Sequence, residues 1–137
     1  MDNLNSKYKQ IITLQNKKGV LVIGLEPTSL DYSSFQDLNA EKVMECLRTE
    51  QDRGRGLGYD IDICLINPNG TDMHIISRKL SQKQFDCIVI GAGIRVLSEY
   101  FLLFEKVINL VHQNAPASII CFNTNPSDTI EAIKRWI

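Results

Sequence analysis

Four short apolar runs, each rich in β-branched residues, constrain the fold of this 137-residue chain more than any other feature. They are GVLVIGL at 19–25, IDICLI at 61–66, CIVIG at 87–91 and SIICF at 118–122. The runs are almost continuously apolar rather than alternating, which is typical of strands buried on both faces. Helix-like segments separate them, so the sequence predicts a parallel sheet covered by helices on both sides.

Capping residues and apolar spacing place four helices between and after these strands. The first is predicted to follow Asn39 as its N-cap and to run through 41–51, with the glycines at 54, 56 and 58 ending it. The second follows NPNGTD, with Thr71 as its cap. The third is predicted over 97–111, where apolar residues recur at helical spacing. The fourth begins at Asn125, with a proline at its first position.

The resulting order of elements is βαβαβαβα. Right-handed crossovers leave few arrangements for such a chain, and the simplest is the flavodoxin-like strand order 2-1-3-4. The sequence therefore predicts an α/β fold, a three-layer αβα sandwich around a four-stranded parallel sheet. We expect one α/β domain over residues 18–137 and an N-terminal extension over residues 1–17.

Composition argues against several classes of partner. The formal net charge is −1, which gives no bulk attraction to nucleic acid or to anionic lipid. No apolar run approaches the roughly 20 residues of a membrane helix, and the first residues lack the apolar core of a signal peptide. We therefore expect a cytoplasmic protein with neither a membrane nor a nucleic acid as partner.

The four cysteines form no CxxC and no close Cys/His pair, so no metal site is expected.

The strand order also predicts where a ligand would bind. In open parallel sheets, ligands bind beyond the carboxyl ends of the strands, at the point where the strand order reverses. Here that point lies between the loops that follow the first and third strands, and the first of these, at 26–37, is long for a βα loop. The candidate ligand-binding residues on these loops and on the neighbouring loop after the fourth strand are Glu26, Asp31, Tyr32, Gly91, Gly93, Arg95, Asn123 and Asn125.

The GAGIR segment at 91–95 resembles the start of a dinucleotide-binding turn but departs from it. The position of the third glycine is occupied by Val96, and the segment follows the third strand rather than the first. We interpret Gly91 and Gly93 as residues that let the backbone turn sharply at the strand end. Arg95, beside a helix N-terminus, suits a phosphate or carboxylate, and the alternative is a structural ion pair to Glu99 or Glu26. No particular cofactor is indicated.

Four segments carry a resemblance to known proteins: GVLVIGLEPTSLDYS, FDCIVIGAGIR, LLFEKVINLVHQNAP and IICFNTNPSDTIEAIKRW. Together they resemble a family of small uncharacterised bacterial proteins with a single flavodoxin- or Rossmann-like α/β domain. The resemblance covers most of residues 19–136. It implies a compact single domain, and it carries no functional residue over to this chain.

Two classes of function follow as hypotheses. The first is a protein that binds a small anionic ligand at the carboxyl edge of its sheet. A hydrolase or transferase reaction there stays open, because the sequence identifies no pair of nucleophile and base. The second is an oligomeric or regulatory module that acts through protein contacts, with Leu102, Leu103 and Trp136 as its surface. It is suggested by an apolar stripe on the third helix that is wider than one sheet face requires.

Overall fold

The structure is a computed structural model that describes residues 17–33 and 37–137. Its centre is a four-stranded sheet in which every neighbouring pair is parallel. β1 (Lys18–Leu25) lies between β2 (Tyr59–Ile66) and β3 (Cys87–Ile90), and β4 (Ile119–Phe122) lies beside β3. The strand order is β2-β1-β3-β4, which confirms the predicted order 2-1-3-4.

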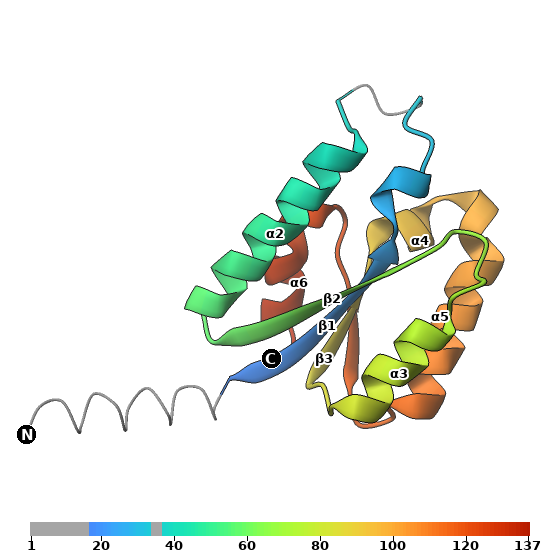
Figure 1. The fold of residues 1–137 in the computed structure, drawn as a ribbon. Helices are drawn as coiled ribbons and strands as arrows, with labels where there is room; N and C mark the ends of the chain where they lie inside the picture. The colour runs from blue at the N-terminus through green and yellow to red at the C-terminus, as the bar shows by residue number, and fades with distance from the viewer. Residues whose placement is uncertain (1–16, 34–36) are drawn as a thin grey trace, which may run out of the picture.

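Helices cover both faces of the sheet (Figure 1). α2 (Ala40–Gly56) and α6 (Thr129–Lys134) lie on one face, and α3 (His74–Gln82) and α5 (Phe101–Asn114) lie on the other. The predicted three-layer αβα sandwich is therefore confirmed. The shorter helices are α4 (Ala92–Val96), η1 (Pro27–Ser29), η2 (Ser98–Tyr100) and η3 (Pro126–Asp128).

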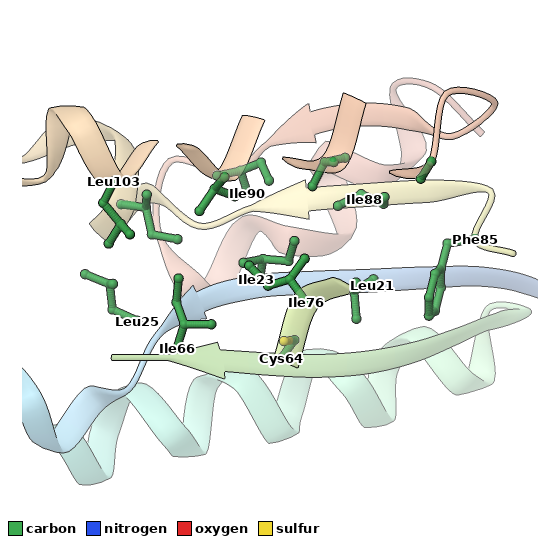
Figure 2. Close-up of a cluster of buried hydrophobic side chains, with 14 residues drawn as sticks. Leu21, Ile23, Leu25, Cys64, Ile66, Ile76, Phe85, Ile88, Ile90 and Leu103 are labelled. Carbon is green, nitrogen blue, oxygen red and sulfur yellow. The ribbon is translucent and has the colours of Figure 1, made fainter. Parts of the chain in front are cut away.

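Alternate residues of each strand supply two separate cores. From β1, Val20 and Val22 pack with α2 and α6, whereas Leu21 and Ile23 pack with α3 and α5. Figure 2 shows the second cluster, in which side chains of β1, β2 and β3 converge. Because successive side chains of a strand point to opposite faces, a strand covered on both sides must be apolar at every position. This requirement explains the near-continuous apolar runs of the sequence.

The first predicted helix is longer than expected. α2 continues to Gly56, so Gly54 and Gly56 lie inside the helix rather than ending it. Of the three glycines, only Gly58 has a positive φ, of 89°, in the turn that leads to β2. Gly54 has a different role, since a Cβ atom built on it would lie 2.4 Å from Ile61 Cδ1. It lets α2 approach the sheet closely.

The third predicted helix begins after Leu97 rather than at it, and the segment before it, predicted as a turn, forms the short helix α4. Leu97 has an extended backbone (φ −89°, ψ 122°), which separates α4 from η2 and α5. Thr71 does not cap the second helix either, because α3 starts at His74 and no side chain caps it. Its neighbour Asp72 instead accepts hydrogen bonds from the backbone N–H of Asn67.

Two other predicted caps are confirmed. The side-chain oxygen of Asn39 accepts a hydrogen bond from Lys42 N at 2.8 Å, at the start of α2. Asn125 forms a capping box with Asp128 at the start of η3, which leads directly into α6. In each case a side-chain acceptor satisfies a backbone N–H that the first turn leaves free.

β1 begins at Lys18, where the α/β domain was predicted to begin. Residues 1–16 of the predicted N-terminal extension lie outside the described residues. Within the described part of the chain, none of the helices combines the length and the apolar character needed to cross a membrane.

Candidate functional site

A pocket of about 320 Å³ lies at the carboxyl ends of β1 and β3. The loop after β1, the first half of α2, the α4–η2 segment and the loop after β4 surround it. Apolar side chains form much of its wall, namely Val22, Leu25, Leu30, Leu38, Val43, Leu47, Leu65, Val96 and Leu97. The pocket therefore lies at the reversal of strand order, where open parallel sheets bind their ligands.

The structure brings together most of the candidate residues that the sequence identified. Those that line the pocket are Asp31, Tyr32, Gly91, Gly93, Asn123 and Asn125. Glu26 and Arg95 are not among the lining residues. Glu26 instead accepts a hydrogen bond from Thr28 Oγ1 at 3.2 Å, within the turn that forms η1.

The guanidinium of Arg95 is directed to β4 rather than into the pocket. Its Nη2 donates a hydrogen bond to the carbonyl oxygen of Asn123 at 2.9 Å. Its central carbon lies 5.7 Å from the ring centroid of Phe122, within the range of a cation–π contact. Among the described residues it forms no ion pair with Glu99 or Glu26. Arg95 thus holds the end of β4 against α4.

Gly91 and Gly93 differ in what their missing side chains permit. A Cβ atom on Gly91 would lie 3.1 Å from the carbonyl oxygen of Ile23 and 3.5 Å from the Cα atom of Gly24. Since both contacts are with backbone, a side chain at 91 would push β3 and β1 apart. A Cβ atom on Gly93 would lie 3.9 Å from Leu25 Cδ1, which is an ordinary van der Waals distance. Of these two glycines, Gly91 alone is required by close packing.

Asn123 connects two walls of the pocket. It is 3% exposed, and its side-chain oxygen accepts a hydrogen bond from Ala92 N at 2.8 Å. Its amide nitrogen donates to Thr129 Oγ1 at 3.1 Å. Both ends of the side chain are therefore used within the protein, so Asn123 shapes the pocket instead of offering a free polar group to a ligand.

The titratable groups that line the pocket are two carboxylates, Asp31 and Glu99, and two phenols, Tyr32 and Tyr100. Hydrogen bonds from Ser33 lower the pKa of Asp31. The backbone N–H of Ser33 donates one of them, with 2.9 Å between Ser33 N and Asp31 Oδ1. Burial raises the pKa of the Tyr100 phenol, and the charges of Glu99 and Asp31 raise it further. Burial and the charge of Glu26 raise the pKa of Tyr32 in the same way. These phenols are therefore neutral hydrogen-bonding groups near neutral pH.

Several lining residues were not identified from the sequence. They are Val96, Leu97, Glu99 and Tyr100, of which the last three fall at the start of the third predicted helix. Leu102 and Leu103, which gave the predicted stripe its excess width, are not among the lining residues. The available signal was the position of this segment directly after the loop that follows the third strand.

The described residues contain no cluster of three or more His, Cys, Asp or Glu side chains that could hold a metal ion. Cys64, Cys87 and Cys121 are buried within the two cores.

Comparison with known proteins gives no family for this chain. No protein family model matches it, no curated protein matches it significantly, and no solved structure does so either. The function must therefore be argued from the geometry of the pocket.

Proposed function

We propose that this protein binds a small organic ligand with a largely apolar body in the pocket at the carboxyl edge of its sheet. The observation that carries the proposal is the apolar pocket of about 320 Å³ at the reversal of strand order. That volume is at the low end of ligand pockets, which span roughly 300–1,000 Å³. Burying the apolar body of such a ligand would supply about 25 cal/mol for each Å² removed from water.

The expected anionic ligand receives less support from this geometry. That prediction depended on Arg95, and the guanidinium is directed to Asn123 and Phe122 instead. The described lining contains no Ser, Cys or His, and its two carboxylates, Asp31 and Glu99, are exposed. We therefore propose binding and assign no catalytic role to any residue.

Filling the pocket tests the proposal. Gly93→Leu would place a side chain in the pocket without a backbone clash, because the Cβ position at 93 is open. The probe is 3-phenylpropan-1-ol, titrated into labelled protein and followed by amide chemical shifts. We expect shifts at lining residues in the wild type and their loss in Gly93→Leu.

Gly56→Leu is the matched control, since its Cβ position is also open and lies outside the pocket. It should bind the probe as the wild type does. Shifts scattered over the surface, or shifts that persist unchanged in Gly93→Leu, would contradict the proposal.

A second candidate function is supported by exposed apolar residues at the start of α5. Phe101 and Leu102 are 61% and 67% exposed, and Trp136 is 59% exposed. Leu103, also considered as a contact residue, is only 7% exposed and packs in the α3/α5 core. A protein-interaction module would then use Leu102 without Leu103. Sedimentation velocity over a range of concentrations tests self-association, which Leu102→Glu should weaken.

A further inference from the structure

The charged residues of the pocket all have the same sign. Its described lining contains two carboxylates, Asp31 and Glu99, and no Lys, Arg or His. Both carboxylates are exposed, so they lie where the pocket meets solvent. The neighbouring cation Arg95 is held at the carbonyl of Asn123. A ligand that enters this pocket therefore meets negative charge at its outer end and apolar side chains further in.

The two carboxylates come from distant parts of the sequence and line the same pocket, together with the phenol of Tyr100. Asp31 is held in place by the backbone N–H of Ser33, 2.9 Å from its Oδ1. The charges of Glu99 and Asp31 also contribute to the raised pKa of the Tyr100 phenol, after the larger effect of burial.

Tyr32 adds a second aromatic ring to the lining. Its hydroxyl donates a hydrogen bond to the carbonyl oxygen of Pro27 at 2.7 Å, which fixes the side chain relative to η1. Aromatic rings attract cations through their negatively charged faces. Two tyrosines and two carboxylates in one apolar pocket form a combination that suits an organic cation.

We infer that the ligand of this pocket is an organic ammonium compound, with its apolar body among the leucines and its protonated amine beside Asp31 and Glu99. This inference rests on the proposed function. It names the chemical class of the ligand, whereas the proposed function requires only that a small, largely apolar molecule binds there.

The expected size of the preference follows from the exposure of the carboxylates. Exposed ion pairs each contribute only weakly, because water screens the two charges. Replacing the ammonium by a carboxylate exchanges two such attractions for two repulsions, so the affinities should differ by about tenfold. The difference should shrink at high salt, because exposed charges are screened.

The test compares three probes of nearly the same shape: 3-phenylpropylammonium, the neutral 3-phenylpropan-1-ol and 3-phenylpropanoate. Each is titrated into wild-type protein and into the double variant Asp31→Asn, Glu99→Gln. The control is Glu105→Gln, an exposed position on α5 that is outside the pocket. We expect the ammonium to bind about tenfold more tightly than the carboxylate in the wild type and the control. The double variant should lose most of that difference.

The outcomes separate the two proposals. Equal affinities for all three probes, or tighter binding of the carboxylate, would overturn the ammonium inference and leave the proposed function standing. A preference for the ammonium that persists in the double variant would also overturn the inference, because the two carboxylates would not cause it. If no probe shifts the lining amides up to its solubility limit, the inference and the proposed function both fail.

Discussion

The side-chain oxygen of Asn123 lies 2.8 Å from the backbone nitrogen of Ala92, although the two residues follow different strands. Ala92 begins α4 after β3, and Asn123 follows β4. The same side chain reaches Thr129 Oγ1 at the start of α6. One buried amide therefore joins three segments at the edge of the sheet, two of which contribute to the pocket wall.

Asn123→Ala should destabilise the protein by about 1–3 kcal/mol, because it removes the partner of the half-buried Ala92 N–H and a buried hydrogen bond to Thr129. Urea denaturation measures this loss. Asn114→Ala is the control, since Asn114 is exposed and donates only to the Leu110 carbonyl of its own helix. It should change stability by no more than about 0.5 kcal/mol. Equal effects at the two positions would show that Asn123 does not hold these segments together.

The two glycines after β3 should respond differently to the same substitution. Gly91→Ala should destabilise the fold by about 1–3 kcal/mol, because the added methyl group would press on the backbone of Ile23 and Gly24. Gly93→Ala should be neutral or stabilising by up to about 1 kcal/mol, because it is helical and has open space. Thermal denaturation of the two variants decides the matter. Similar losses at both positions would contradict this distinction.

The architecture could be predicted from the sequence because strands buried on both faces appear in it as runs of apolar residues. Strands covered on both faces need apolar side chains, and β3 meets this requirement along its length and β1 from its second residue onward. The crossover rule then limits the strand order. The position of the pocket followed from that order, and Asp31, Tyr32 and Asn123 were identified because they lie on the correct loops.

The direction of individual side chains and the extended backbone at Leu97 could not be predicted in this way. Helical spacing continues through Leu97 in the sequence, yet its backbone is extended in the structure, and only tertiary packing distinguishes the two. Arg95 lies at the predicted edge, but its rotamer leads to Phe122 and not to the pocket. The position of a residue in the sequence predicts the edge of the sheet at which its backbone lies. It does not predict the direction of the side chain.

Gly54 and Gly56 form a second contrasting pair. Gly56→Ala should stabilise the protein by about 0.5–1 kcal/mol, because alanine favours the helix and meets nothing within 4 Å. Gly54→Ala should destabilise it despite the same gain in helix propensity, since its methyl group would overlap Ile61 Cδ1. Chemical denaturation of both variants provides the comparison. Stabilisation by both would mean that α2 does not depend on close approach at Gly54.

The thiols of Cys87 and Cys121 should remain reduced in the native protein, although their sulfur atoms are 3.2 Å apart. Cys87 is paired in register with Ile119, so Cys121 is its diagonal neighbour on the adjacent strand. Diagonal neighbours have Cα atoms about 7–8 Å apart, and a disulfide cannot span more than about 7 Å without backbone movement. Diamide treatment followed by peptide mapping should therefore show both thiols free. A Cys87–Cys121 linked peptide would show that the strands shift readily.

Glu50 and Glu131 should make opposite contributions to the pH dependence of stability. Glu50 is 3% exposed, and its Oε1 has no hydrogen-bond partner among the described residues, while its Oε2 accepts a hydrogen bond from Arg53 at 3.1 Å. Burial raises the pKa of Glu50 more than Arg53 lowers it. A group with a raised pKa in the folded state contributes stability at low pH that is lost as the pH rises through that pKa. Glu131 is exposed, and its hydrogen bond from Arg53 lowers its pKa, so its contribution is lost as the pH falls.

The free energy of unfolding should be measured between about pH 7 and pH 4 for the wild type, Glu50→Gln and Glu131→Gln. The effect of the new amide on packing does not depend on pH. The informative quantity is therefore how the difference in unfolding free energy between each variant and the wild type changes with pH. As the pH falls, the wild type should gain stability relative to Glu50→Gln and lose it relative to Glu131→Gln. Because both residues contact Arg53, each variant serves as the other's control. Parallel trends for the two variants would show that burial does not dominate the ionisation of Glu50.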